Sequence, residues 1–153
     1  MKYVVDTCAI NRIADELFDP DSELPAGSEF YITHVQYDEL NNVPDKDKER
    51  RAQLSLVTAK LRPKLIPTES TAWDVTRWDQ AKLGEGATYN DVRAALDARN
   101  RRKANNPQDA LIAESALKNG WTLLTADRDL ADVVEDRGGT VHFIAAKKQP
   151  RSP

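Results

Sequence analysis

Cysteine is scarce in this chain, because Cys8 is the single one among its 153 residues. One cysteine cannot form an internal disulfide, which fits a reducing compartment and leads us to expect a cytoplasmic protein. His34 and His142 are the only histidines and lie far apart in the sequence, so a zinc site of cysteine and histidine has no support. We expect Cys8 to be a small buried apolar residue without chemistry of its own.

Long apolar runs and glycine-rich loops are also missing. No apolar stretch approaches the length needed to span a membrane, so no membrane partner is expected. The opening Met1-Lys2-Tyr3-Val4-Val5 meets Asp6 where a signal peptide would continue with apolar residues. There is no glycine-rich phosphate loop and no Gly-x-Ser-x-Gly turn, which argues against the nucleotide-binding and serine hydrolase classes that use them.

Positive charge does not dominate, since the net charge is −3 at pH 7. This balance argues against indiscriminate binding of nucleic acid by the whole surface, yet it permits a local basic face. The first candidate for such a face consists of Arg99, Arg101, Arg102 and Lys103. Two further basic groups are Lys48, Arg50 and Arg51, and, near the end of the chain, Lys147, Lys148 and Arg151. Solvated helix faces look the same in sequence, so that interpretation stays open for each group.

Short β-prone runs alternate with amphipathic stretches along the chain. The predicted strands are 3–5, 30–33, 64–67, 121–125 and 140–144, and the predicted helices are 7–18, 34–40, 45–61, about 68–78, 90–103, 106–119 and 128–137. Strands that alternate with helices predict an α/β fold in three layers, with a mainly parallel sheet flanked by helices. We expect one domain over residues 1–144 and a basic tail over 145–153.

The stretch from Asn106 to Leu117 contains the first candidate functional residue, Asp109. Pro107 suits the first position of a helix, and Asp109 follows in the first turn, where the helix dipole favours negative charge. After the helix stops at Asn119-Gly120, a β-prone run leads directly to Asp127. Each aspartate by itself is explained as a helix cap, so a functional role needs partners elsewhere in the chain.

Four acidic residues stand at comparable places of the predicted fold. Asp6 ends the first strand, Glu39 lies in the helix after the second, and Asp109 and Asp127 complete the set. The ends of parallel strands share one edge of a sheet, so we expect these four side chains to converge there. Their mutual repulsion would be relieved by a divalent cation, and oxygen ligands are what Mg²⁺ and Mn²⁺ prefer. Such a cluster can activate water against a phosphodiester.

These acidic residues lie in motifs that resemble those of PIN-domain ribonucleases. The motifs are Val4-Val5-Asp6-Thr7, Glu39-Leu40, Pro107-Gln108-Asp109-Ala110-Leu111-Ile112-Ala113 and Leu124-Thr125-Ala126-Asp127-Arg128-Asp129-Leu130. Within that family the chain is most similar to the VapC-type toxins of toxin–antitoxin pairs. The resemblance covers about residues 1–144.

The resemblance implies a Mg²⁺- or Mn²⁺-dependent endoribonuclease, inhibited by a partner antitoxin and often a homodimer. Asp6, Glu39, Asp109 and Asp127 would be the catalytic and metal-binding residues, and Asp129 a further ligand. Thr7 and Thr125 would make hydrogen bonds beside the site, and Arg101, Arg102 and Lys103 would contact the RNA substrate.

Three other functions remain open at this point. A PIN-like domain can process RNA without being a toxin, or serve as a binding scaffold without turnover. A phosphotransfer domain would use Asp6 as a covalent nucleophile, but the sequence has no second aspartate and no lysine at the positions that this chemistry requires. Retention of all four acidic residues argues against a pure scaffold, because a buried carboxylate cluster costs stability.

Overall fold

A computed structural model of the chain describes residues 1–70 and 86–146. Within them, five parallel strands form one sheet in the order β3-β2-β1-β4-β5. The strands are β1 (Lys2–Val5), β2 (Glu29–Ile32), β3 (Lys64–Leu65), β4 (Thr122–Thr125) and β5 (Val141–Phe143). This confirms the predicted fold class. Two sequence-based predictions lie outside the described residues. They are the helix around Trp73 and Trp78 and the basic group of Lys147, Lys148 and Arg151.

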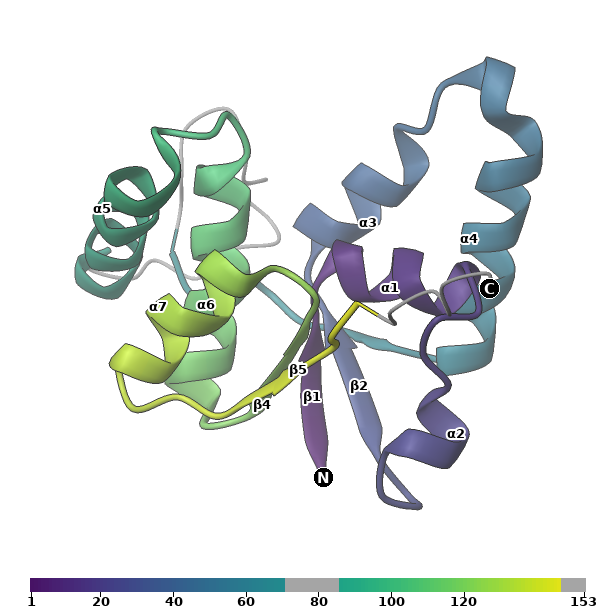
Figure 1. The fold of residues 1–153 in the computed structure, drawn as a ribbon, viewed down its shortest axis with the longest axis horizontal. Helices are drawn as coiled ribbons and strands as arrows, with labels where there is room; N and C mark the ends of the chain where they lie inside the picture. Colours follow the sequence, from purple (N-terminus) through teal and green to yellow (C-terminus); the bar gives the residue numbers. More distant parts are fainter. Residues whose placement is uncertain (71–85, 147–153) are drawn as a thin grey trace, which may run out of the picture.

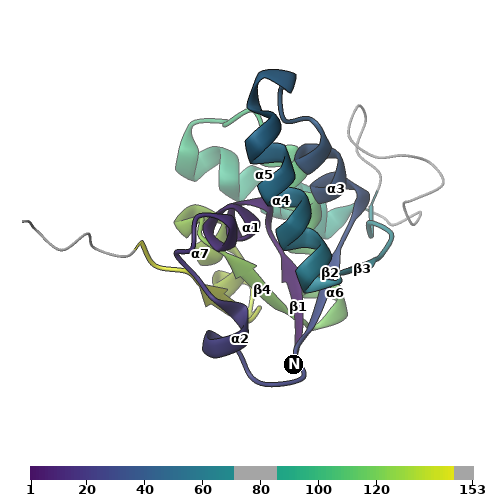
Figure 2. The same cartoon turned by 90° about the vertical axis from the view of Figure 1, so that its right-hand side faces the viewer.

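Helices cover both faces of this sheet. They are α1 (Thr7–Ala14), α2 (Pro20–Glu23), α3 (His34–Asn41), α4 (Lys48–Leu61, after the 3-10 turn η1 at Asp45–Asp47), α5 (Ala87–Asn100), α6 (Asn106–Asn119) and α7 (Arg128–Asp136). Figure 1 shows α5, α6 and α7 on one side of the strands and α1 and α4 on the other. Figure 2 shows α4 lying across α1, against which it packs. No helix within the described ranges is long and apolar enough to cross a membrane.

The central strand β1 explains why the sheet needs two helical layers. Val4 points into the core under α5, α6 and α7, whereas Tyr3 and Val5 point into the core under α1 and α4. All three side chains are buried. A parallel strand with apolar side chains on both faces is stable only when both faces are covered, and the two helical layers provide that cover.

The strand order also fixes where a site can form. From β1 the chain moves to β2 on one side, while β4 pairs with the other side of β1. The order therefore reverses between β1 and β4, and α/β sheets bind ligands outside the carboxyl ends of the strands at such a point. In Figure 1 the starts of α1, α3 and α6 lie at this edge.

Two local predictions were wrong in detail. The first helix ends at Ala14 and not at Phe18, because Glu16 adopts a left-handed conformation with φ of 58°. The loop expected over residues 19–28 contains the single turn α2, where Asp19 accepts a hydrogen bond from the amide of Asp21 and Pro20 is the first helical residue. Short polar residues before proline favour such a start.

The buried α6 face supplies a test of the core. Leu111 on α6 is 0% exposed, whereas Leu56 on α4 is 72% exposed. Leu111→Ala should lower the free energy of unfolding by about 2–5 kcal/mol, because it removes buried methyl groups and leaves a cavity. Leu56→Ala, the matched change at the surface, should alter it by less than about 0.5 kcal/mol. Urea unfolding of both variants measures the difference, and equal losses would contradict the assignment of Leu111 to the core.

Candidate metal and catalytic site

Asp6 sits where β1 ends beside β4. Its amide donates to the carbonyl oxygen of Leu124 at 3.0 Å, so the pairing of the two strands continues to this residue. Asp6 keeps an extended backbone and precedes α1 directly. Its side chain is only 4% exposed. The strand pairing therefore delivers a carboxylate into a buried position at the edge where ligand sites form.

Two side chains hold this carboxylate. The Thr125 hydroxyl donates to Asp6 Oδ2 at 2.8 Å, and the Cys8 thiol donates to the same oxygen at 2.9 Å. Burial is the main reason that the pKa of Cys8 is raised above its usual value, and the neighbouring Asp6 carboxylate raises it further. The thiol therefore stays protonated. Cys8 is thus half-buried and polar in its contacts, where a small buried apolar residue was expected.

Asp127 stands at the start of α7. Its Oδ1 accepts hydrogen bonds from the amides of Asp129 at 2.9 Å and Leu130 at 3.3 Å, so one oxygen does cap the helix. The Asp127 amide in turn donates to Thr125 Oγ1 at 3.0 Å. Asp127 is half-buried, and its charge raises the pKa of both Asp6 and Asp109. Asp127 therefore caps α7 and also interacts electrostatically with Asp6 and Asp109.

Glu39 is brought to the same edge by α3. Thr33 and Gln36 form a capping box at the start of this helix. The Gln36 side chain also donates to the carbonyl oxygen of Val5 at 3.1 Å, which ties α3 to the end of β1. Glu39 follows three residues later, and the Asp6 carboxylate raises its pKa. Gln36 thus fixes the helix that carries Glu39 next to the strand that carries Asp6.

Asp109 completes the group from the first turn of α6. It is 6% exposed, and its side chain does not cap the helix, which begins after Asn105. Its pKa is raised to about 8, first by burial and then by the charges of Asp6, Glu39 and Asp127, while Lys103 acts in the opposite direction. The other three predicted acidic residues therefore all lie within electrostatic reach of Asp109. We refer to Asp6, Glu39, Asp109 and Asp127 as the acidic cluster.

The environment makes full ionisation of this cluster unfavourable. Burial is the largest cause of the raised pKa of Asp6, and the hydrogen bonds from Cys8 and Thr125 partly offset it. Burial likewise raises the pKa of Glu39, and the nearby Thr7 hydroxyl lowers it. Desolvation and like charges both favour the neutral carboxyl. A cation would reverse this balance by supplying the missing positive charge.

Asp129, predicted as a further ligand, is not brought into this group. Its carboxylate pairs with Arg99 of α5 at 3.4 Å, and its side chain is 40% exposed. The Thr7 hydroxyl is close enough to Glu39 to lower its pKa, although Thr7 Oγ1 is buried and makes no hydrogen bond of normal geometry with any described residue. The same holds for Gln108 Oε1, which adjoins Asp109 in sequence.

The cluster fits a hard divalent cation in charge and in donor type. It offers carboxylate oxygens together with the buried hydroxyl oxygen of Thr7 beside Glu39, and oxygen is what Mg²⁺ and Mn²⁺ select. Across residues 1–70 and 86–146, no three carboxylate, histidine or cysteine side chains are gathered tightly enough to hold an ion as they stand. The carboxylates are neighbours and do not yet surround one point.

A positively charged turn borders the acidic cluster. Arg101, Arg102 and Lys103, which we call the basic turn, join α5 to α6 and are exposed. Both arginines adopt left-handed backbone conformations with φ of 58°. Lys103 is near enough to Asp109 to lower its pKa. Lys103 thus lies near Asp109, while contact of the basic turn with RNA stays a prediction.

The basic turn is held by a network of amide side chains. Asn106 is fully buried and exchanges hydrogen bonds of 2.8 Å with the Asn100 side chain in both directions. Asn106 also donates to Asp97 at 2.8 Å, and the amide of Lys103 donates to Asn100 at 3.3 Å. These contacts join the end of α5 to the start of α6, so the turn is fixed at both ends.

The sequence did not indicate the polar contacts of three residues, of which two lie at the cluster and Glu114 lies away from it. Cys8 and Gln36 hold Asp6 and α3, as described above. Glu114 of α6 is fully buried and accepts hydrogen bonds of 3.0 Å from the Ser70 hydroxyl and the Tyr89 amide. The spacing of Thr33 and Gln36 is the capping-box pattern and was a usable signal for Gln36. No comparable signal marks Cys8 or Glu114.

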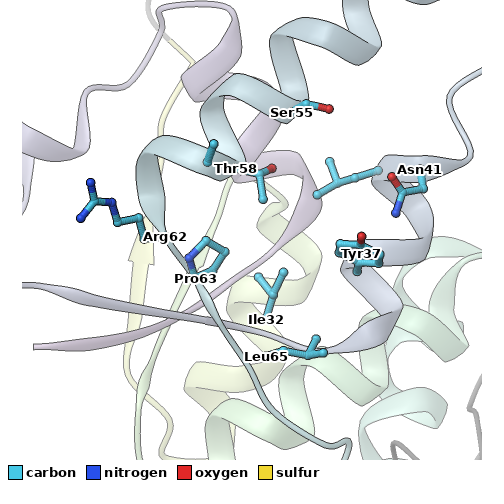
Figure 3. Close-up of a pocket in the computed structure, with 10 residues that line it drawn as sticks. Ile32, Tyr37, Asn41, Ser55, Thr58, Arg62, Pro63 and Leu65 are labelled. Carbon is cyan, nitrogen blue, oxygen red and sulfur yellow. The ribbon is translucent and has the colours of Figure 1, made fainter.

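A separate apolar groove lies on the far side of α3. It has a volume of about 470 Å³ and lies between α3, α4 and β3. Figure 3 shows Tyr37, Thr58 and Leu65 among its lining residues, with the Arg62 guanidinium turned away from them. Tyr37 and Leu65 are 52% and 59% exposed. This groove does not include any member of the acidic cluster.

The raised pKa of Asp109 predicts how stability depends on pH in chelator-treated protein. Between pH 4 and 8 Asp109 keeps its proton in the folded state and loses it in the unfolded state, since its ordinary pKa is 3.8 and its folded pKa about 8. Unfolding then releases a proton, so stability falls as pH rises, by at most about 1.4 kcal/mol per pH unit for this group. Asp109→Asn should flatten this fall and be stabilised relative to wild type at pH 8.

Urea unfolding from pH 5 to pH 9 measures this effect. Asp91→Asn serves as the control, because Asp91 is exposed, pairs with Arg137 and has a lowered pKa. The control should keep the wild-type slope between pH 5 and 9. An Asp109→Asn variant with the wild-type slope would contradict the electrostatic coupling of the cluster.

Known proteins were compared with this arrangement of strands and acidic residues. Structural neighbours include a domain of a functionally unknown protein from Methanocaldococcus jannaschii (18% identity, 99% of this chain and 96% of that chain, TM-score 0.54). They also include VapBC-1 from nontypeable Haemophilus influenzae (18%, 94% and 98%, TM-score 0.56) and VapBC2 from Rickettsia felis bound to a promoter DNA fragment (17%, 94% and 98%, TM-score 0.53). These likenesses show a shared fold. Curated protein sequences give no significant match.

The family model for the PIN domain matches residues 3–136. That range begins inside β1 and ends with α7, so it contains the whole acidic cluster together with the strands and helices that position it. The chain belongs to the PIN domain family.

Proposed function

We propose that this protein is a Mg²⁺- or Mn²⁺-dependent endoribonuclease. The observation that carries the proposal is the burial of Asp109 beside three other carboxylates, which raises its pKa to about 8. A buried group of like charges is costly to maintain in a fold unless a ligand uses it. Membership of the PIN domain family, whose members are nucleases, supports a hydrolase that acts on phosphodiester bonds.

The acidic cluster would hold the cation through Asp6, Glu39, Asp109 and Asp127. A divalent cation bound there would lower the pKa of a water molecule and neutralise negative charge on the phosphodiester. Asp129 does not belong to this proposed ligand set, because its carboxylate pairs with Arg99. Thr125 would keep Asp6 oriented, since its hydroxyl donates to Asp6 and accepts from the amide of Asp127.

The basic turn would bind the RNA backbone. Its three cations are exposed, and the side-chain network around Asn106 holds the turn beside Asp109. Phosphate contacts by lysine and arginine supply most of the sequence-independent affinity for nucleic acid. A fixed basic turn next to an acidic cluster would therefore place a phosphate near the site without requiring a basic protein overall.

We further propose that the nuclease is the toxin of a toxin–antitoxin pair. Two structural neighbours are VapBC proteins, and the resemblance of the sequence motifs to VapC-type toxins points the same way. The groove between α3 and α4 exposes Tyr37 and Leu65 in an apolar surface, which is the kind of surface that a protein partner covers. A PIN nuclease that processes RNA without a toxin role is the alternative. Growth arrest on induced expression, and its relief by coexpression of a candidate antitoxin, would separate the two.

The metal dependence can be tested first by thermal unfolding. Mn²⁺ or Mg²⁺ should raise the melting temperature, because a cation that binds only the folded state stabilises it by about 2.7 kcal/mol at one hundred times its dissociation constant. Excess chelator should remove the gain, and Asp109→Asn should show a much smaller gain. A melting temperature that does not change with millimolar metal would argue strongly against a shared site.

Cleavage of a defined single-stranded RNA, followed in the same preparations, tests the chemistry. Asp109→Asn should lose cleavage by orders of magnitude while its circular dichroism stays that of the wild type. Glu114→Gln is the matched control, because Glu114 is also a buried carboxyl of α6 but contacts Ser70 and Tyr89 instead of the cluster. It should retain cleavage and metal binding. Persistent cleavage by a purified Asp109→Asn protein would refute the role assigned to Asp109.

RNA binding should depend on the basic turn. Arg101→Ala combined with Arg102→Ala should weaken RNA binding and reduce the salt slope by about 0.7 for each phosphate that the variant no longer neutralises. The matched control is Lys60→Ala with Arg62→Ala, which removes the same charge from the end of α4, where Arg62 also has a left-handed backbone. Fluorescence anisotropy at several salt concentrations compares the pairs. Identical slopes in wild type and in the Arg101 and Arg102 variant would show that the turn is only solvated surface.

A further inference from the structure

The Cys8 thiol lies in a small polar network at the ends of β1 and β4. Cys8 Sγ is 2.9 Å from Asp6 Oδ2, 3.3 Å from Thr125 Oγ1 and 3.2 Å from the amide nitrogen of Ala126. Three contacts of this kind are unusual for a cysteine that serves only to fill space. Cys8 is the only cysteine of the chain, so no disulfide competes for it.

The donors and acceptors in this network can be assigned by elimination. The Ala126 amide must donate to Cys8 Sγ, and the Asp127 amide must donate to Thr125 Oγ1, because an amide N–H can only donate. The thiol and the hydroxyl each carry one hydrogen. Asp6 Oδ2 lies 2.9 Å from Cys8 Sγ and 2.8 Å from Thr125 Oγ1, so it can accept both hydrogens. The thiol and the hydroxyl then do not need to donate to each other.

Asp6 Oδ2 therefore receives two hydrogen bonds from side chains that are themselves anchored to the backbone after β4. The backbone amide of Thr7 also stabilises the Asp6 carboxylate and lowers its pKa, although burial dominates and raises it. The two side-chain hydrogen bonds both go to Oδ2, so neither Cys8 nor Thr125 occupies Oδ1.

We propose that Cys8 is a positioning residue for the metal site, whose thiol holds Asp6 Oδ2 together with Thr125 and leaves Oδ1 as the oxygen that binds the cation. This inference rests on the proposed function. A carboxylate bound through one fixed oxygen loses less rotational freedom when the cation arrives, so removal of the thiol should weaken binding. Outer hydrogen-bonding partners of metal ligands usually contribute about 10–100-fold to affinity or activity.

The first experiment measures Mn²⁺ affinity in variants of Cys8. Cys8→Ala removes the hydrogen bond, Cys8→Val removes it while filling the volume, and Cys8→Ser restores a donor. Isothermal titration should give dissociation constants at least about tenfold larger for Cys8→Ala and Cys8→Val, and within about threefold of wild type for Cys8→Ser. Wild-type affinity in Cys8→Val, or equal weakening in Cys8→Ser and Cys8→Val, would overturn the proposal.

The second experiment needs neither metal nor activity. Raman spectroscopy of the chelator-treated wild type detects the S–H stretching band of its single thiol, and a thiol that donates to a carboxylate has a lowered stretching frequency. The band should rise in frequency when the protein is unfolded in urea and also in folded Asp6→Asn, where a neutral amide replaces the carboxylate. A native band at the unfolded frequency would overturn the assignment, whatever the variants do.

The two experiments separate this inference from the proposed function. If the wild type binds no Mn²⁺ while its S–H band is lowered, the metal-dependent function fails and the ligand role of Asp6 Oδ1 fails with it, but the hydrogen bond stands. If the wild type binds Mn²⁺ and cleaves RNA while the Cys8 variants bind Mn²⁺ normally, the nuclease stands and the positioning role of Cys8 is wrong.

Discussion

Repulsion among four carboxylates is the constraint on which the rest of this structure depends. Burial and neighbouring negative charge raise the pKa of Asp6, Glu39 and Asp109, so the fold holds these groups together against their own electrostatics. It can do so because each one is carried by a different rigid element, namely the end of β1, the helix α3 and the first turn of α6. Sites on helices and strands are positioned more precisely than sites on loops. Holding these carboxylates together lowers the stability of the protein, and under the proposed function a bound cation would offset that loss.

The supporting hydrogen bonds all converge on the reversal point of the sheet. Gln36 ties α3 to the carbonyl oxygen of Val5, immediately before Asp6. Thr125 joins Asp6 to the amide of Asp127, immediately after β4. These two side chains brace β1 from both sides, and both are fully buried. A buried side chain that satisfies backbone groups of other elements fixes their relative position more strictly than apolar packing does. Geometry at the acidic cluster is therefore maintained by polar contacts, while the apolar cores under the two helical layers provide the stability.

Much of this arrangement could be predicted from the sequence, and the reasons differ between its parts. Alternating β-prone runs and amphipathic stretches identified every described strand and the order of the longer helices, because hydrophobic periodicity records which faces are buried. The four acidic residues could be placed at one edge because parallel strands end on the same side. Helix ends were less predictable, since the left-handed backbone at Glu16 has no strong sequence signal. The pairing of Asp129 with Arg99, and the thiol of Cys8 beside Thr125, depend on contacts across 30 and 117 residues that no local pattern records.

Asp6 and Asp127 lie at the ends of β1 and β4, where the strand order reverses. Each uses one carboxylate oxygen for hydrogen bonds within the protein. Asp127 uses Oδ1 to cap α7, and Asp6 uses Oδ2 to accept from Cys8 and Thr125. In each carboxylate these side-chain and helix-capping bonds go to one oxygen, and under the proposed function the other oxygen would face the cation. A carboxylate with both oxygens free could rotate or bind a cation through both of them, whereas these two would offer single oxygens whose directions are fixed by the helix start and by the strand ends. Mg²⁺ demands near-ideal octahedral geometry and keeps several of its waters, so single, fixed oxygens suit it better than mobile pairs. Under the proposed function, this division of oxygens would suit a small, hard cation that keeps some of its own waters.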